Sequence, residues 1–156
     1  MHNLKKQTGT FKGTIGECMF RIVYNKVIIN RFFNKQRCLD YYYNYFTKNQ
    51  LNFLDTYWSS IDAFEVDEKN KKIILYEIKI RAEEYKNMDY PMRLSPRIAQ
   101  IYKKAPELSF ETKLAIVWFC NNWEYYIEII NFDDGYYYID HSQNYKRYKM
   151  NTIFKN

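Results

Sequence analysis

The sequence is poor in the residues that build many familiar catalytic and structural sites. Its 156 residues include only two histidines, His2 and His141, and three cysteines that are far apart and form no Cys-x-x-Cys pair. These scarcities argue against a histidine-dependent triad, a zinc hydrolase, a zinc knuckle and a disulfide framework. Any metal ion bound by this protein is therefore expected to have oxygen ligands.

The sequence also lacks a long apolar run and a signal-peptide pattern at Met1. We therefore expect no membrane segment and a cytoplasmic location. No internal repeat, low-complexity tract or interdomain linker is present, and the length suits one packed core. We expect a single domain over residues 1–156, with a flexible basic arm at 1–12 and a basic peripheral tail at 141–156.

Positive charge is in excess. Lysine and arginine together number 24 against 18 aspartates and glutamates, which gives a formal net charge of +6. An excess of this kind is typical of proteins whose partner is a polyanion, although many basic proteins have none. Charge therefore makes nucleic acid a candidate partner without identifying it.

The apolar pattern predicts helices and strands in alternation. In "GTIGECMFRIV" the apolar residues recur at helical spacing, and Thr14 with Glu17 matches a capping box, so a helix is predicted to begin at Thr14. Residues 26–58 are compatible with either helix or strand. Ser95 and Pro96 predict the start of another helix, which Pro106 ends.

Strands are predicted from three further segments, "TKLAIVWFC", "WEYYIEII" and "YYYID", with a turn at Asn121-Asn122 between the first two. Helix, strands, helix and strands then follow one another along the chain. This order predicts an α/β or α+β fold, in which a mixed central β-sheet packs against flanking helices.

The stretch "IDAFEVDEKNKKIILYEIKI", residues 61–80, is the most informative. Its polar centre "DEKNKK" predicts a turn between two apolar strands. The register that places apolar residues opposite apolar residues gives three pairs: Val66 with Ile73, Phe64 with Leu75, and Asp62 with Glu77. Two acidic side chains are thus predicted to face each other at the end of the hairpin away from the turn.

Opposed side chains on one sheet face have β-carbons about 5 Å apart, so two carboxylates there repel each other unless a cation lies between them. A hard divalent ion, Mg²⁺ or Mn²⁺, suits oxygen ligands. Lys79 lies on the same face, one pleat beyond Glu77, where it can orient or deprotonate a water or offset phosphate charge. The alternative is a solvated hairpin end with ordinary surface ion pairs.

These motifs, in this order, resemble the PD-(D/E)XK nuclease superfamily, and within it the small archaeal, phage and viral enzymes similar to Holliday junction resolvases. Four segments carry the likeness over about residues 10–120: "GTIGE" with Glu17, "SSID" with Asp62, "YEIK" with Glu77 and Lys79, and "AQIY" with Gln100. Two departures leave the subfamily and substrate open. Ile61 stands where the family name has proline, and the aromatic stretch 38–58 is longer than in many small relatives.

The resemblance implies a restriction-endonuclease-like core and Mg²⁺-dependent hydrolysis of phosphodiester bonds, with Mn²⁺ as a substitute. Asp62 and Glu77 would hold the ion, with the Ile78 carbonyl completing the shell, and Lys79 would act on the attacking water. Glu17 would reach in from the first helix. The alternative for Glu17 is a helix cap without a catalytic role.

The expected partner is duplex or branched DNA, and the resemblance implies a homodimer that pairs two cuts; a viral source would place the protein in the host cytoplasm. Two alternatives stay open: an RNA endonuclease, and a non-catalytic nucleic-acid-binding or virion-associated protein on a nuclease-like scaffold. Contacts to the phosphate backbone are expected from the helix after Ser95 and from nearby basic residues. These candidates are Lys12, Arg81, Lys86, Arg93, Arg97, Gln100, Lys103 and Lys104, followed by the tail residues Lys146, Arg147 and Lys149.

Overall fold

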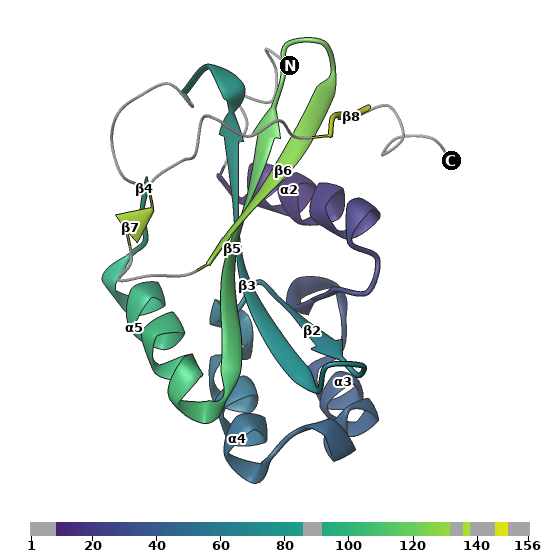
Figure 1. The fold of residues 1–156 in the computed structure, drawn as a ribbon, viewed down its shortest axis with the longest axis vertical. Helices are drawn as coiled ribbons and strands as arrows, with labels where there is room; N and C mark the ends of the chain where they lie inside the picture. The colour runs from purple at the N-terminus through teal and green to yellow at the C-terminus, as the bar shows by residue number, and fades with distance from the viewer. Residues whose placement is uncertain (1–8, 86–91, 132–135, 138–145, 150–156) are drawn as a thin grey trace.

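A mixed six-stranded sheet forms the centre of the molecule (Figure 1). The computed structural model describes residues 9–85, 92–131, 136–137 and 146–149. The strands are, in spatial order, β1 (Ile28–Ile29), β2 (Ala63–Asp67), β3 (Lys72–Ala82), β5 (Phe110–Phe119), β6 (Glu124–Asn131) and β8 (Tyr148–Lys149). Neighbouring strands are antiparallel except β3 and β5, which are parallel. The predicted α+β architecture with a mixed sheet is confirmed.

Helices cover both faces of this sheet. They are α2 (Gly9–Val23), α3 (Lys35–Tyr41), α4 (Lys48–Tyr57) and α5 (Pro96–Lys104). Short 3₁₀ turns lie at η1 (Asn30–Phe32), η2 (Tyr43–Tyr45), η3 (Trp58–Ser60), η4 (Glu83–Tyr85) and η5 (Ala105–Leu108). A separate two-stranded sheet pairs β4 (Met92–Arg93) with β7 (Tyr136–Tyr137). Among the described residues, no helix has both the length and the apolar character needed to span a lipid bilayer.

The alternation along β3 divides the core into two layers. Ile74, Tyr76 and Ile78 belong to the layer that contains Met19 and Phe20 of α2. Residues on the other face of β3 pack with α3, α4 and α5. Full burial of a large apolar side chain contributes about 1.5–3 kcal/mol, so these two layers fix which face of β3 each side chain occupies.

Helix α5 makes the crossover that the parallel pair β3 and β5 requires. Ser95 caps it by accepting a hydrogen bond from the Ile98 N–H at 3.4 Å, and Pro96 occupies its first turn, as predicted. Ile101 and Tyr102 of this helix are buried in the core. The helix ends at Lys104, and Pro106 lies in η5, so the sequence located both ends of this helix.

The first helix differs from the prediction. It begins at Gly9, so Thr14 is not its N-cap and Glu17 is not part of a capping box. The Thr14 hydroxyl instead accepts a hydrogen bond from Nη1 of Arg31 at 2.5 Å, which a sequence motif cannot foresee. Residues 9–12 of the expected flexible arm therefore belong to α2, and residues 1–8 lie outside the described residues.

Two predictions near the C-terminus also change, one of a strand and one of a peripheral tail. From "YYYID" only Tyr136 and Tyr137 are described as strand, and they pair with β4 rather than with the central sheet. The expected peripheral tail contributes β8, which pairs with Glu124 and Tyr125 of β6, while residues 141–145 and 150–156 lie outside the described residues.

The undecided region 26–58 is mostly helical, and Asn34 and Thr47 cap α3 and α4.

Gly16 offers a test of how closely α2 packs on the sheet. A β-carbon at Gly16 would lie 3.1 Å from Cδ1 and 3.2 Å from Cβ of Ile80, whereas one at Gly13 would meet nothing within 4 Å. Alanine gains about 1 kcal/mol over glycine inside a helix, and overpacking costs about 1–3 kcal/mol. We predict that Gly13→Ala stabilises the protein and that Gly16→Ala is less stable than Gly13→Ala by about 1–2 kcal/mol. Urea unfolding followed by circular dichroism checks this, and equal stability of the two variants would contradict the close packing.

Candidate functional site

The hairpin of β2 and β3 has the predicted register. Val66 pairs with Ile73, Phe64 with Leu75, and Ala63 with Tyr76. Asp62 directly precedes Ala63 and Glu77 directly follows Tyr76, so the two acids are neighbours at the end of the hairpin. Strand β2 begins there, whereas β3 continues to Ala82. The acids therefore lie where β3 loses its antiparallel partner.

Asp62 is held from both sides by backbone hydrogen bonds. Its Oδ2 accepts from the Ile78 N–H at 2.8 Å, and its main-chain oxygen accepts from the Asn30 N–H at 3.0 Å. In an antiparallel strand the N–H and C=O of one residue point to the same side. The Ile78 carbonyl thus faces the side on which Asp62 lies, while the Ile78 side chain is buried in the layer under α2.

Glu77 is a buried carboxyl group that is only partly satisfied. Its residue is 4% exposed, and Oε1 forms an ion pair with Nζ of Lys79 at 2.8 Å. The other oxygen, Oε2, is buried and has no hydrogen-bond partner among the described residues. A buried acceptor without a donor is costly, by about 1–3 kcal/mol, so it marks a place that a proton or a cation would stabilise.

The two acids perturb each other's ionisation. Burial, followed by the negative charge of Asp62, raises the pKa of Glu77 from its ordinary 4.5 to about 8, and Lys79 opposes both. Burial also raises the pKa of Asp62, against the Ile78 N–H and Lys79, which lower it. Without a compensating cation, the pair therefore holds a proton into the neutral range.

Glu17 joins these acids from α2. It is buried, and Gly16 beside it lets the helix approach Ile80 closely. Burial and then the charge of Asp62 raise the pKa of Glu17 to about 7, while Arg31 lowers it. The Arg31 Nε lies 3.5 Å from Oε2 of Glu17. Glu17, Asp62 and Glu77 are called the acid cluster below.

A pocket of about 400 Å³ opens onto the acid cluster. Its lining residues are Glu17, Asn30, Arg31, Phe33, Trp58, Ser59, Ile61 and Asp62. Asn30 shapes it, because its Nδ2 donates to the Trp58 carbonyl at 3.1 Å. Glu77 does not line this pocket, so the two acids that a ligand meets first are Glu17 and Asp62.

Arg31 is the site residue that the sequence prediction missed. It lies in η1, within the region 26–58 that the pattern left undecided, and it contacts both Thr14 and Glu17 of α2. Its side chain is 46% exposed at the pocket. A single basic residue within the apolar run "VIINRFF" was the signal that could have found it.

The donor set for a metal ion is small. Among the described residues, no three or more histidine, cysteine, aspartate or glutamate side chains are placed so that they could together hold a metal ion, and this includes the three acids of the acid cluster. The oxygen donors at the hairpin end are the carboxylates of Asp62 and Glu77 and the main-chain carbonyl of Ile78. Two carboxylates and one carbonyl suit an ion such as Mg²⁺, which usually keeps several waters.

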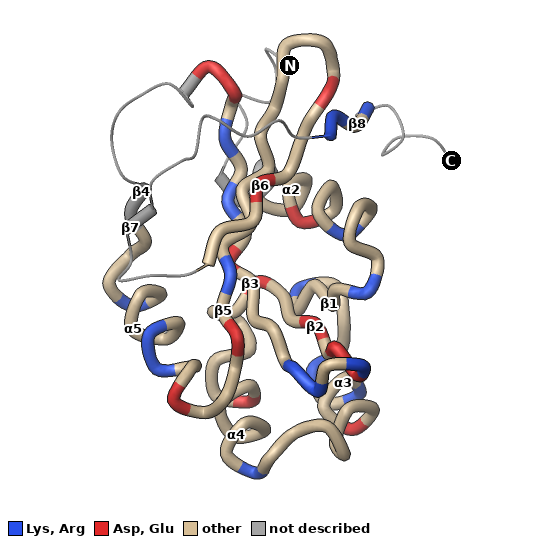
Figure 2. Tube along the Cα trace, in the orientation of Figure 1, with Lys and Arg blue, Asp and Glu red and all other residues tan. Residues whose placement is uncertain are grey.

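Some of the predicted nucleic-acid-binding residues lie within the described part of the chain and others do not. Four of them, Arg97, Gln100, Lys103 and Lys104, are exposed on α5. Figure 2 shows basic positions along this helix. Arg81 is exposed at the end of β3 and donates to the Ile80 carbonyl. The Lys12 and Arg93 side chains and the whole of Lys86 lie outside the description. In the tail, Arg147 pairs with Glu83 at 2.8 Å and Lys149 with Glu124 at 2.5 Å, so these two cations are already compensated.

Comparison of this chain with protein-family models, with curated proteins and with solved structures gives no match. The resemblance to PD-(D/E)XK nucleases therefore stays an expectation carried by Glu17, Asp62, Glu77 and Lys79. The structure brings these four residues and the Ile78 backbone to one end of the hairpin.

The raised pKa of Glu77 predicts how stability depends on pH. In buffer with a chelator, the folded state binds more protons than the unfolded state between pH 4.5 and about 8, so the free energy of unfolding should fall as pH rises through this range. Glu77→Gln removes that titration and should flatten the dependence. The control is Glu111→Gln, because Glu111 on β5 pairs with Lys72 and Lys113 away from the acid cluster. Urea unfolding at about pH 5 and about pH 8.5 measures the effect; equal slopes for Glu77→Gln and wild type would refute the burial argument.

Proposed function

We propose that this protein is a metal-dependent endonuclease that hydrolyses phosphodiester bonds in DNA, built on a restriction-endonuclease-like core. The observation that carries the proposal is the opposed pair Asp62 and Glu77 with Lys79 beside it. This pair is electrostatically unfavourable by itself, because burial and mutual repulsion raise both pKa values. A structural role would be served better by neutral residues, which supports a role in binding a cation.

The residues fit a divalent ion at this position. The buried Oε2 of Glu77 lacks a hydrogen-bond partner among the described residues, and Asp62 uses Oδ2 to accept from Ile78. Asp62, Glu77 and the Ile78 carbonyl would hold Mg²⁺ or Mn²⁺ in place of the retained proton. Such an ion, when bound, supplies Lewis-acid polarisation of a phosphoryl oxygen and lowers the pKa of a coordinated water.

The chain's own side chains then have separate roles. The Lys79 side chain is 29% exposed and forms an ion pair with Glu77. From this position it can orient the attacking water or offset charge on the phosphate. Glu17, with a pKa of about 7, can accept or donate a proton near neutral pH. Arg31 presents a guanidinium at the pocket, and this group suits a phosphate oxygen.

Binding of the DNA backbone is assigned to exposed basic residues, chiefly those of α5. Contacts of this kind give affinity that falls with salt and has little sequence preference. Duplex and branched DNA both fit this mode. Paired cuts in a branched substrate need two active sites, so a homodimer is part of the proposal.

Two observations favour a second function, a non-catalytic nucleic-acid-binding protein. Lys79 already compensates one oxygen of Glu77, and three metal-binding side chains are not gathered among the described residues. Such a protein would bind DNA or RNA without turnover in Mg²⁺ or Mn²⁺.

Cleavage assays decide between these functions. We predict that wild-type protein cuts labelled duplex or four-way junction DNA in Mg²⁺ or Mn²⁺ but not in a chelator. Glu77→Gln and Lys79→Met should each lower the rate by about 10²–10⁴-fold, since a positioned catalytic group typically contributes this much. Matched RNA strands, tested in parallel, identify the nucleic acid.

The controls are Glu111→Gln and Lys72→Met, which break an ion pair of the same type at the opposite end of β3 and β5. They should cut at nearly the wild-type rate. Glu77→Gln activity within a few-fold of these controls would show that the site is assigned wrongly. DNA binding without any cutting in either metal would establish the non-catalytic function.

A further inference from the structure

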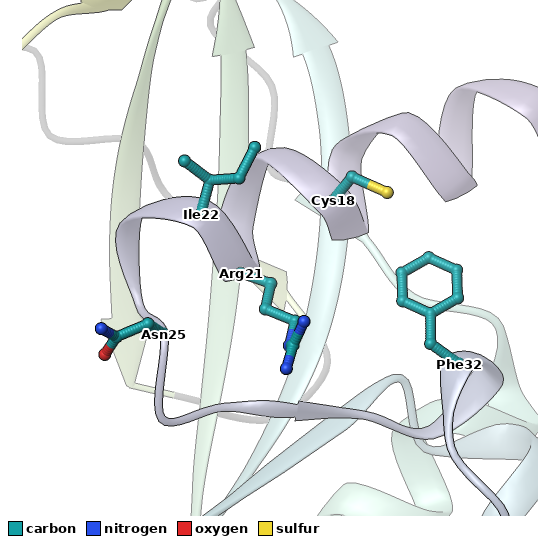
Figure 3. A pocket seen from close by; sticks show the side chains of 5 residues that line it. All are labelled: Cys18, Arg21, Ile22, Asn25 and Phe32. Atoms are coloured by element: carbon teal, nitrogen blue, oxygen red, sulfur yellow. The ribbon is translucent and has the colours of Figure 1, made fainter. Parts of the chain in front are cut away.

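A second pocket, of about 510 Å³, is lined by residues of α2, of the segment that follows it and of η1 (Figure 3). Its lining residues are Cys18, Arg21, Ile22, Asn25 and Phe32. Figure 3 shows Cys18 and Arg21 projecting from the helix, Asn25 just beyond the helix end, and Phe32 rising from η1. This volume falls within the range of about 300–1,000 Å³ that is usual for small-ligand sites.

The two pockets are lined by neighbouring residues of α2 and of the η1 region. Glu17 of α2 and Arg31 of η1 line the first pocket. The residues that directly follow them in the sequence, Cys18 and Phe32, line the second. The guanidinium of Arg21, in the second pocket, lies 4.9 Å from the ring centroid of Phe33, which lines the first. The contact between Arg21 and Phe33 therefore joins the linings of the two pockets.

The lining of the second pocket combines groups that suit an aromatic, hydrogen-bonding ligand with an anion attached. Phe32 is 41% exposed and Ile22 is 49% exposed, so both present apolar surface to solvent. Arg21 supplies a positive charge, and none of the five residues is acidic. The Asn25 amide can both donate and accept, as the edge of a nucleobase requires.

We propose that this pocket binds an unpaired nucleobase of a strand whose phosphate backbone passes the acid cluster. The proposal rests on the nuclease function and adds the substrate class, which is nucleic acid with single-stranded or splayed nucleotides at the cut. The Phe32 ring stacks on the base, and Arg21 contacts an adjoining phosphate. A base inside an intact duplex is stacked and paired, so it cannot enter the pocket.

Fluorescence anisotropy tests this with labelled oligonucleotides of one sequence, as a single strand and as a blunt duplex, in Ca²⁺ in place of Mg²⁺. Phe32→Leu keeps an apolar side chain and removes the ring. Because stacking contributes about 1–3 kcal/mol per base, we predict a loss of single-strand affinity of roughly 5- to 100-fold with duplex affinity unchanged. Phe32→Trp should retain the affinity.

The matched control is Tyr41→Leu, which removes a ring that is 77% exposed on α3 and lines neither pocket. It should bind both oligonucleotides like wild type. Phe32→Leu binding the single strand as tightly as Tyr41→Leu, or losing both oligonucleotides equally, would overturn the proposal. Circular dichroism of each variant confirms that the fold is intact.

The nuclease function can fail separately. If Glu77-dependent cleavage is present while Phe32→Leu binds single strands normally, the base pocket is wrong and the nuclease function stands. If Phe32→Leu loses single-strand affinity while wild-type protein cuts nothing in Mg²⁺ or Mn²⁺, the base pocket stands and the catalytic function is wrong.

Discussion

The repulsion between the carboxyl groups of Asp62 and Glu77 is the constraint on which the site depends. The hairpin register keeps these groups together, and apolar pairs such as Phe64 with Leu75 fix that register. A slip by one residue would turn every side chain of one strand to the other face, which two buried core layers forbid. Core packing therefore offsets the electrostatic cost of holding the acids side by side.

The neighbouring groups hold the acids in place and compensate their charge only in part. The Ile78 N–H orients Asp62, Lys79 compensates one oxygen of Glu77, and Gly16 lets α2 bring a third acid close. One oxygen of Glu77 is still left without a donor among the described residues. An arrangement that lowers stability in this way is typical of sites prepared for a ligand, because the groups need no rearrangement when the ligand arrives.

The sequence predicted the parts of this site that depend on local periodicity. The strand register that makes Asp62 and Glu77 neighbours followed from matching apolar residues across one turn, and α5 followed from Ser95 and Pro96. The parts that failed depend on contacts between distant segments. Thr14 resembled a helix cap, but the helix begins at Gly9, and the Thr14 hydroxyl accepts a hydrogen bond from Arg31, which also pairs with Glu17.

The most direct test of the central claim is a crystal of the protein soaked with Mn²⁺ and measured at a wavelength where manganese scatters anomalously. The account predicts one anomalous peak between the carboxylates of Asp62 and Glu77, close to the Ile78 carbonyl, that disappears in Glu77→Gln. Carboxyl groups that turn to different sides of the sheet, or density that is absent at saturating Mn²⁺, would contradict it.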